Sequence, residues 1–556
     1  MELNLAASFE AIAREVPERD CLVWRDRRLS WADVDDRSRR LAAVLRGAGL
    51  GIADAGRAGP VPTDGWRSHQ DHVALYLLNG TEYLEAMLGA YKARAVPFNV
   101  NYRYVADELA YVLADAGTRA IVYGGRFAST LAAVRDRLDR LELLLQVDDG
   151  SGAPLLDGAV DYEEALAAAD PALPADLVAS WSGDDQYMVY TGGTTGAPKG
   201  VLWRQADFLV AALGVRRRDG SDYEHIDEIV ERARGGGLRA LPAPPFMHGA
   251  AHWNAISAWV AGGTVVIQSD VEHLDPADVL ATCERERVTS LLIVGDAFAL
   301  PLIEELRRHR YDLSSLRHLM TGGAVLGAER KAALTELVPG LTVVDVLGSS
   351  ETGRHGVAST GGGREPSEGS GFRPSTTTVV LSADLDRTLA PGDPEVGWLA
   401  QRGRVPRGYL NDPDKTRATF PTLGGVRHAV AGDRARLRAD GTIELLGRDS
   451  VTINSGGEKI FAEEVEQALK AHPDVVDVVV VGRPSERWGS EVVAVVQLRP
   501  GSDADADTLR EAAGRTIARY KLPKAVVVVD RVERNPNGKA NYRWASERAR
   551  GSSASA

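Results

Sequence analysis

The sequence predicts an α/β protein. It has a large N-terminal domain of βα-alternating sheets that includes a small β-barrel-like part, and a small, mobile α+β domain after it. Three observations support this expectation. The 556 residues exceed the length over which one hydrophobic core keeps growing. Strand-like and helical patterns alternate over residues 8–446, as in largely parallel sheets covered by helices. Beyond residue 447 a shorter α+β pattern begins, so we expect domains at 1–447 and 448–556.

Short apolar runs bounded by turn residues predict the strands of the large domain, and helical spacing predicts the helices between them. The expected strands are residues 73–78, 120–123, 264–267 and 290–294. The expected helices follow residue 31 and span 82–93, 276–287 and 297–308. Short strands with Gly and Pro turns at 395–410 and 435–446 predict the β-barrel-like part.

Two stretches of the large domain are predicted to be solvated insertions. Residues 51–70 are rich in Gly, Pro and Ala, and residues 216–237 carry mixed charges and end in three glycines. Within the second, Ile226, Ile229 and Val230 are spaced for one short amphipathic turn. The alternative for the second insertion is that it gates a substrate entrance.

In the small domain, β-rich runs and helical segments are expected in turn. The predicted helices are 462–469 and 506–518, and the predicted strands are 475–481, 492–498 and 525–529. The tail 551–556 is expected to be disordered.

Composition narrows the class of protein. The net charge of −13 comes from 65 basic and 78 acidic side chains and disfavours nucleic acid as a partner. With only Cys21 and Cys283, a disulfide framework is not expected and a reducing compartment fits. No secretion signal begins the chain, and no apolar run nears the roughly 20 residues that span a bilayer. We therefore expect a cytoplasmic protein with no transmembrane segment.

A glycine- and threonine-rich segment between two apolar runs predicts a phosphate-binding loop. Its glycines let backbone N–H groups converge, its hydroxyls add donors and its lysine adds a mobile charge. It differs from the Walker pattern, because Pro198 precedes the lysine and Gly200 follows it. The alternative is a flexible surface loop. The expected phosphate ligands are Thr191, Gly192, Gly193, Thr194, Thr195, Gly196 and Lys199.

Five further motifs follow in a fixed order: 321–324, 345–353, 431–433, 447–460 and 534–539. Together with the phosphate loop they resemble the adenylate-forming superfamily, which contains acyl-CoA synthetases, carrier-protein adenylation domains and beetle luciferases. The resemblance covers residues 9–542. It implies a reaction in which a carboxylate attacks the α-phosphorus of ATP, pyrophosphate leaves, and the acyl-adenylate then reacts with CoA.

The resemblance also implies roles for individual residues in the first step. Thr191, Glu351 and Lys539 are the expected catalytic residues: Glu351 would hold Mg²⁺, and Lys539 would reach in from the small domain. Asp345 would accept the adenine amino group, Asp433 would bind the ribose and Arg448 the ribose or a phosphate. The other expected nucleotide contacts are Gly322, Gly323, Ala324, Val346, Leu347, Gly348, Ser349 and Ser350.

For the second step, the resemblance implies that the small domain swings about a hinge at Ser450. Gly456, Gly457 and Glu458 would then face CoA. Two positions depart from the family pattern: Leu347 replaces an aromatic residue that stacks on adenine, and Ser450 replaces an Asp or Lys. Homodimers occur among such enzymes, but no residue pattern indicates one here.

The acyl site is expected around residues 244–249, with His248, Gly249, Trp253, Gly295, Gly323 and Leu347 as its lining. This segment lacks the Asp that holds an α-ammonium group in amino-acid-activating relatives. His248 and His252 have i, i+4 spacing, but no third ligand suggests a metal site. Asp296 is the nearest candidate for a polar residue of the pocket, but the favoured role is that of N-cap for a helix from Ala297 onward. The segments 92–103 and 453–459 resemble actinobacterial fatty-acyl and steroid side-chain CoA ligases, which favours an apolar acid.

The favoured function is therefore an AMP-forming acyl-CoA ligase that uses ATP, Mg²⁺, CoA and a small carboxylic acid. An alternative is a stand-alone adenylating enzyme that passes the acyl group to a carrier protein or an amine. A non-catalytic nucleotide-binding relative is disfavoured, because Lys199, Glu351, Asp433, Arg448 and Lys539 are all present. An α/β-hydrolase is set aside, because residues 348–352 lack the last glycine of the nucleophile elbow.

Overall fold

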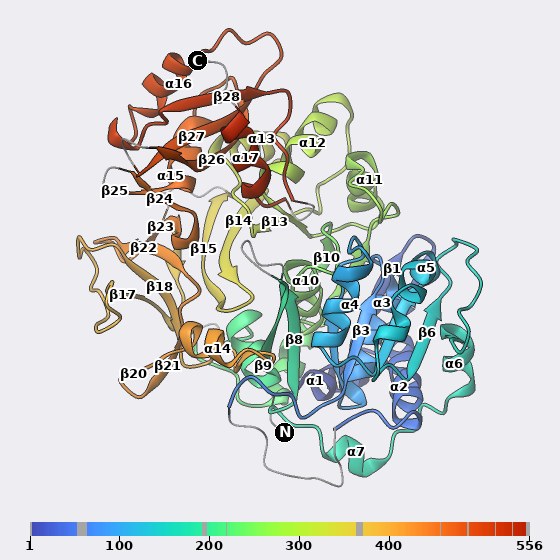
Figure 1. Ribbon diagram of the computed structural model, residues 1–556. Helices are drawn as coiled ribbons and strands as arrows, with labels where there is room; N and C mark the ends of the chain where they lie inside the picture. The colour runs from blue at the N-terminus through green and yellow to red at the C-terminus, as the bar shows by residue number, and fades with distance from the viewer. Residues whose placement is uncertain are drawn as a thin grey trace.

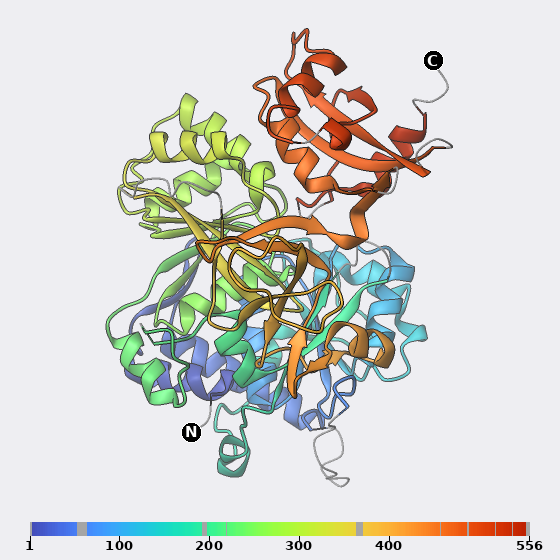
Figure 2. The same cartoon turned by 90° about the vertical axis from the view of Figure 1, so that its left-hand side faces the viewer.

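The computed structural model describes residues 3–52, 64–191, 197–217, 219–362, 371–455, 458–485, 489–517, 519–535 and 538–551. Two mainly parallel sheets and two antiparallel ones form the body of the molecule, and a small α+β unit lies at one end (Figure 1). Figure 2 shows this unit, drawn in orange and red, standing over the rest. The expected fold class is confirmed.

The first sheet is parallel throughout and has the strand order β4-β3-β5-β6-β7. Its strands are β3 (His72–Tyr76), β4 (Val96–Asn99), β5 (Ala120–Gly124), β6 (Leu143–Val147) and β7 (Val160–Asp161). The central strands are buried along their whole length, as expected for apolar runs with helices on both faces. The crossover helices include α3 (Thr81–Lys92) and α4 (Ala106–Asp115).

The second sheet has the order β16-β15-β14-β13-β12-β10-β11-β1-β2, and its middle strands are parallel. Its strands are β1 (Asp20–Trp24), β2 (Arg27–Ser30), β10 (Arg239–Pro242), β11 (Thr264–Ile267), β12 (Ser290–Ile293), β13 (His318–Gly322), β14 (Thr342–Ser349), β15 (Gly353–Gly361) and β16 (Arg373–Pro374). Its helices include α10 (Gly249–Trp259), α11 (Pro276–Arg285), α12 (Gly295–Arg308) and α13 (Ala328–Leu337).

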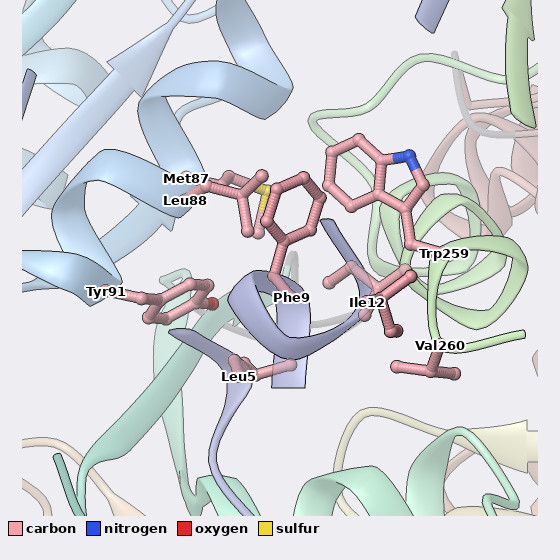
Figure 3. A pocket seen from close by; sticks show the side chains of 9 residues that line it. Leu5, Phe9, Ile12, Met87, Leu88, Tyr91, Trp259 and Val260 are labelled. Carbon is pink, nitrogen blue, oxygen red and sulfur yellow. The ribbon is translucent and has the colours of Figure 1, made fainter. Parts of the chain in front are cut away.

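N-terminal residues complete the core between the two sheets. Helix α1 (Leu5–Glu15) and helix α2 (Trp31–Gly47) pack there, and α2 begins with a capping box between Ser30 and Asp33. Phe9 stacks on Trp31 at a ring distance of 4.7 Å. A void of about 20 Å³ remains between α1, α3 and α10, lined by Phe9, Met87, Trp259 and other apolar side chains (Figure 3). A void of this size without polar lining is a packing defect, not a ligand site.

Antiparallel strands form the rest of the large domain. One sheet joins β19 (Gly408–Tyr409), β9 (Lys199–Arg204) and β8 (Gln186–Thr191). The other has the order β20-β21-β18-β22-β23, with β17 paired to β18, where the β-barrel-like part was expected. Its strands are β17 (Thr378–Leu381), β18 (Gly397–Arg402), β20 (Thr422–Leu423), β21 (Val426–Ala429), β22 (Asp433–Leu437) and β23 (Ile443–Arg448).

The small unit begins with a hairpin of β24 (Thr452–Ser455) and β25 (Glu458–Phe461). Helix α15 (Ala462–Lys470) follows, and β26 (Val475–Ser485), β27 (Gly489–Leu498) and β28 (Ala525–Val529) make one sheet. Helix α16 (Ala506–Ala513) ends at Gly514, earlier than predicted, and α17 (Tyr542–Gly551) closes the chain. Residues 552–556 lie outside the described part. Within the described ranges, each helix is too short or too polar to cross a lipid bilayer.

Two sequence expectations are wrong. Residues 226–234 form a full helix, α9 (Ile226–Arg234), with Ile226, Ile229 and Ala233 buried against the core, so this stretch is not solvated decoration. Its arginine Arg234 is bonded to Glu15 of α1. The pattern was underestimated because the charges that surround the three apolar residues lie on the outer face. Of the 51–70 stretch, residues 53–63 lie outside the described part.

The second error concerns Asp296. Helix α12 begins at Gly295, two residues earlier than predicted, and Val294 is its N-cap residue. Asp296 therefore lies in the first turn, and its Oδ1 accepts a hydrogen bond from the Gly327 N–H at 2.8 Å. The positive φ of 56° at Gly295 lets the chain enter the helix directly after β12.

Candidate active site

A loop of the small domain brings Lys539 onto the large domain. A Cβ placed on Gly538, where φ is +77°, would lie 3.2 Å from Cγ1 of Val294, so this glycine packs tightly at the end of β12. A Cβ placed on Gly323 would lie 3.9 Å from Cε of Lys539. The lysine side chain therefore passes over the segment after β13 that the sequence predicts as the adenine wall.

Charged groups from distant segments gather around this lysine. Glu351 follows β14, Asp433 begins β22 and Arg448 ends β23. Arg448 Nε lies 3.3 Å from Asp433 Oδ1, as expected for paired residues of two adjacent antiparallel strands. Burial and the charge of Arg448 lower the pKa of Lys539, while Glu351 and Asp433 oppose that shift. These four charges thus act on one another in one buried place.

The same charges shift the titration of their neighbours. Burial, together with the charge of Glu351, raises the pKa of Asp433 above its ordinary value, although Arg448 lowers it. Burial lowers the pKa of Arg448, but the attraction of Asp433 and Glu351 outweighs it and the net shift is upward. Such mutual compensation keeps a buried charge cluster stable while leaving it poised for a charged ligand.

Glu351 is oriented by groups on two other elements. Its Oε1 accepts a hydrogen bond from the Tyr409 hydroxyl of β19 at 3.2 Å. The preceding carbonyl, of Ser350, accepts one from Nε1 of Trp203 in β9 at 3.0 Å. The strand end itself requires Gly348, because a Cβ there would lie 2.3 Å from the Gly353 carbonyl oxygen. The β14–β15 turn therefore places Ser349, Ser350 and Glu351 in a fixed order.

The wall beside this turn is made by small residues at the ends of β13 and β14. A Cβ on Gly322 would lie 3.0 Å from the Val346 carbonyl, and one on Gly295 would lie 2.9 Å from the Ala324 Cβ. Asp345 Oδ2 forms an ion pair with Lys331 of α13 at 2.7 Å. Burial raises the pKa of Asp345 despite that lysine. The structure brings Gly322, Gly323, Ala324, Asp345 and Val346 together at the ends of β13 and β14.

The predicted phosphate loop connects β8 to β9. Thr191 and Lys199 are paired across these antiparallel strands. Gly192, Gly193, Thr194, Thr195 and Gly196 lie outside the described residues. Lys199 forms an ion pair with Asp412, whose other oxygen caps helix α14 (Pro413–Thr419) through the Lys415 N–H at 2.9 Å.

The predicted acyl segment forms a neutral, hydrogen-bonded wall. His252 Nδ1 lies 2.8 Å from the Phe246 carbonyl, so this nitrogen carries the proton and Nε2 accepts from the Tyr187 hydroxyl. The Tyr187 oxygen in turn accepts from Nε1 of Trp253. Burial lowers the pKa of His252 to about 4. Because both ring nitrogens are used, His252 has no lone pair for a metal ion.

His248 and Gly249 lie at the start of α10, between this wall and the charge cluster. A Cβ on Gly249 would lie 3.6 Å from Val189 Cγ2, 3.6 Å from Trp253 Nε1 and 3.7 Å from Ser350 Oγ. Burial, followed by the charges of Arg103 and Lys539, lowers the pKa of His248 to about 4. Its Nε2 is buried and has no hydrogen-bond partner among the described residues. A neutral imidazole thus stands close to the lysine that enters from the small domain.

A separate cavity of about 560 Å³ lies at the carboxyl ends of β3, β5 and β6. Arg126 lines it but is bonded to Asp149 at 2.9 Å and to Glu272 at 2.6 Å. The lining of the cavity also includes Arg25, but the five carboxylates of Glu82, Asp148, Asp149, Asp270 and Glu272 outnumber the two arginines. This excess of negative charge disfavours a polyphosphate in the cavity.

Comparisons with known proteins agree with this geometry. The family model described as AMP-binding enzyme matches residues 65–410, and the AMP-binding enzyme C-terminal domain matches residues 464–539. The chain belongs to the AMP-binding enzyme family. It is 49% identical to the medium-chain acyl-CoA ligase Mig of Mycobacterium avium over 98% of both chains. It is 37% identical to a 3-oxocholest-4-en-26-oate–CoA ligase of Rhodococcus rhodochrous, over 98% of this chain and 96% of that protein.

Among solved structures, the anthranilate CoA ligase AuaEII in complex with anthranoyl-AMP has the same fold. It matches with a TM-score of 0.81 and 22% sequence identity, over 100% of this chain and 98% of that one. The full-length relatives place this member of the AMP-binding enzyme family in its group of acyl-CoA ligases. The predicted membership of the family is therefore confirmed.

In this AMP-binding enzyme, Leu347 has a packing role that its sequence motif did not reveal. Its side chain is 9% exposed and packs with Val380, Leu399 and Ala435 of the antiparallel sheet. The residue that would face adenine therefore also joins β14 to that sheet. The contact follows the alternation of β14, in which Val343, Asp345 and Leu347 are buried, and a β-bulge comes directly after it, between Leu347 and Gly348.

The parts expected to serve CoA and the hinge are described only partly. Gly456 and Gly457 lie outside the described residues, and Glu458 is described by its backbone as the first residue of β25. Ser450 lies in a short 3₁₀ turn, Asp449–Val451, between β23 and β24. Its neighbour Asp449 is bonded to Arg434 at 3.0 Å.

Sequence reasoning missed three functional candidates of this enzyme. Tyr409 holds Glu351, Asp412 pairs with Lys199, and Tyr187 connects His252 to Trp253. Each acts across strands that are far apart in the sequence, so no spacing rule could have found it. One feature of the sequence could have indicated Tyr187: a residue with a hydroxyl group begins the otherwise apolar run 187–190.

Proposed function

We propose that this protein is an AMP-forming acyl-CoA ligase that activates a medium-chain fatty acid. The observation that carries the proposal is the entry of Lys539 from the small domain over Gly323, beside Glu351, Asp433 and Arg448. This arrangement is the one needed when a carboxylate attacks the α-phosphate of ATP. The choice of acid follows the relative with 49% identity.

In the first half-reaction, the chain supplies alignment and positive charge. Lys539 would stabilise the charge that develops between the acid carboxylate and the α-phosphate. Thr191 and Lys199 would hold the departing phosphates, and the ion pair of Lys199 with Asp412 would be exchanged for them. The phosphate ligands also include Gly192, Gly193, Thr194, Thr195 and Gly196, which complete the loop in sequence.

The nucleoside would lie against the ends of β13 and β14. Asp345 would accept the adenine amino group, and Asp433 the ribose hydroxyls, since a carboxylate accepts from both. Arg448, already bonded to Asp433, would contact the ribose or a phosphate. The remaining contacts would be Gly322, Gly323, Ala324, Val346, Leu347, Gly348, Ser349 and Ser350.

Glu351 would hold Mg²⁺, which would neutralise part of the negative charge of the phosphates. The donor set fits a magnesium ion, because Glu351 offers a carboxylate held by Tyr409 and no cluster of three His, Cys, Asp or Glu occurs among the described residues. Mg²⁺ is commonly bound by one or two carboxylates together with substrate phosphates, not by a cage of side chains.

The acyl chain would lie along α10, between His248, Gly249 and Trp253, with Gly295, Gly323 and Leu347 toward the reacting carboxylate. Burial keeps the nearby histidines neutral, since it lowers the pKa of both His248 and His252 to about 4. A wall of neutral and apolar groups favours an acid without a second charge.

In the second half-reaction, the small domain, 448–556, would turn against the large one, 1–447, about Ser450. Lys539 would leave, and Gly456, Gly457 and Glu458 would face the pantetheine arm of CoA. The CoA thiolate would then attack the acyl carbonyl and release AMP. The hinge turn is short and is followed by a separate hairpin, which suits rotation as a unit.

An acid panel tests the proposal. Butanoic, octanoic, dodecanoic and hexadecanoic acids, a steroid side-chain acid and ferulic acid would each be incubated with ATP, Mg²⁺ and CoA, and AMP and thioester would be measured. We expect the highest kcat/KM for octanoic or dodecanoic acid. A higher kcat/KM for the steroid acid would contradict the proposed substrate class. AMP formation that needs a phosphopantetheinyl protein instead of CoA would overturn the acceptor.

A further inference from the structure

A charged contact joins the two domains beside the acyl and adenine walls. Nζ of Lys470, the last residue of α15, lies 3.2 Å from Oδ2 of Asp296 in the first turn of α12. Both side chains are largely buried, with exposures of 15% and 13%. Figure 1 shows α12 and α13 of the large domain next to the small domain.

On the small domain, this contact continues toward the active centre through a fixed set of ion pairs. Lys470 also lies 3.1 Å from Asp477 Oδ1, and Asp477 forms two bonds of 2.6 Å with the Arg534 guanidinium. Arg534 Nη1 then donates to the Gly538 carbonyl at 3.3 Å. Gly538 directly precedes Lys539. The position of the lysine is therefore connected to Lys470 by charged bonds within one domain.

On the large domain, Asp296 is equally well held. Its Oδ1 accepts from the Gly327 N–H at 2.8 Å, so one carboxylate oxygen is fixed and the other faces Lys470. Gly327 follows the segment 322–324 of the adenine wall. The bond between Oδ2 and Nζ thus connects two rigid ends, and it must break when the small domain turns, whereas the Lys470–Asp477–Arg534 set moves with that domain.

We propose that Asp296 and Lys470 form an electrostatic latch that holds the small domain in the orientation for adenylation and so positions Lys539. The inference rests on the proposed two-step function. Asp296 does not touch the reacting atoms; it acts through Lys470 as a positioning residue. The latch favours the first half-reaction and opposes the second, so the strength of one ion pair sets the balance between them.

Asp296→Asn tests the latch with little change of shape, because the amide oxygen still accepts from Gly327. Acyl-adenylate formation in a single turnover is expected to fall about fivefold, as for the loss of one partly buried ion pair. Thioester formation from pre-formed acyl-adenylate and CoA is expected to stay the same or to rise. High salt should reduce the difference between the two proteins, because it screens the pair in the parent.

Two further variants separate the latch from a general effect on folding. Glu329→Gln removes a more exposed ion pair between the domains, Arg499–Glu329, which is 3.5 Å long with side chains 51% and 61% exposed, and should change neither half-reaction. Lys470→Arg keeps the charge and should keep adenylation near the parent rate. If Asp296→Asn does not fold, Lys470→Arg against Lys470→Met gives the same comparison.

The results have distinct meanings. An equal fall in both half-reactions, or unchanged adenylation in Asp296→Asn, would overturn the latch. If the parent protein itself forms no acyl-adenylate with any acid of the panel, the proposed function fails instead. A double variant Asp296→Asn/Lys470→Met that adenylates no more slowly than Lys470→Met alone would support direct coupling of the two residues.

Discussion

The two walls of the active site are held in different ways. The nucleotide wall is a cluster of charges, in which Arg448 pairs with Asp433 and Lys539 stands among them. The acyl wall is a chain of neutral hydrogen bonds from Trp253 through Tyr187 to His252. Charges that compensate one another can be rearranged by a charged ligand, whereas neutral bonds fix a shape. We therefore expect the charged cluster to act on the nucleotide and the neutral wall to select the acid.

Removing the central charge should have the largest effect. For Lys539→Ala, the rate of adenylation is expected to fall by about two to three orders of magnitude, since one positioned donor to developing charge is lost. Thioester formation from supplied acyl-adenylate should fall far less. Single-turnover AMP formation and thioester formation would be measured separately. Arg543→Ala, at a side chain 92% exposed on α17, is the control. Unchanged adenylation in Lys539→Ala would remove this residue from the mechanism.

Because the histidines of the neutral wall are uncharged in the fold, the free energy of unfolding should depend on pH. His252 has a pKa of about 4 in the fold, below its ordinary value of 6.5, because it is buried. The unfolded chain therefore binds more protons between these values, and the free energy of unfolding falls as the pH is lowered from 6.5 toward 4. This one group contributes about 3 kcal/mol, fully present above pH 6.5.

Chemical denaturation of His252→Phe at several pH values measures that contribution. The variant is less stable at pH 7, because Tyr187 loses a partner, but its loss of stability between pH 6.5 and 4 should be smaller than in the parent. His273→Phe, at an exposed side chain, should leave the slope unchanged. An identical slope in His252→Phe and the parent would contradict the neutral-wall interpretation.

A smaller effect is expected on the choice of acid. Gly249 has ordinary contact distances to Val189, Trp253 and Ser350, so a methyl group fits but a branched side chain enters the space between α10 and β8. Gly249→Val should lower kcat/KM for dodecanoic acid about tenfold relative to butanoic acid, since each displaced methylene costs binding. Gly249→Ala should change the ratio little. Equal losses for all acids would show that the position does not line the chain.

Much of the fold was predictable because local patterns determined it. The run 264–267 and the helix starting at Pro276 were placed within two residues, since buried parallel strands are continuous apolar runs and Asp275 caps that helix. Helix α9 was underestimated, because three buried apolar residues in a charged segment are recognised only once α1 lies against them. Asp296 was assigned to a cap, because its partner Lys470 lies in the other domain.

Candidate site residues could be predicted where they belong to the family motifs. They could not be predicted where their contacts depend on the pairing of strands that are distant in the sequence. Gly323, Glu351, Asp433 and Lys539 were found from motif order, and the structure brings them together. Tyr409 and Asp412 were not found, because their roles arise from the pairing of β19 with β9. Antiparallel pairing of this kind is a long-range choice that sequence spacing does not encode.

The hydroxyl of Tyr409 offers the smallest and most specific test of the charged wall. Burial and the adjacent Glu351 carboxylate raise the pKa of Tyr409, so the hydroxyl stays protonated and donates to Glu351 throughout the assay range. Tyr409→Phe keeps the ring contact with Phe420 at 5.6 Å. It removes the bonds of the hydroxyl to Glu351 and to Thr419. Adenylation should fall about threefold, at the lower end of the net contribution of one hydrogen bond, and the Mg²⁺ concentration for half-maximal rate should rise.

Tyr520→Phe, at an exposed tyrosine of the small domain, is the matched control and should change neither quantity. The Mg²⁺ titration separates two explanations for a slower Tyr409→Phe enzyme. If Tyr409 orients Glu351 toward the metal, added Mg²⁺ restores most of the rate, because the carboxylate is present but less well aligned. A lower rate that no Mg²⁺ concentration restores would mean that the hydroxyl acts on the β9–β19 pairing instead. The charged wall would then depend on strand packing as much as on its ion pairs.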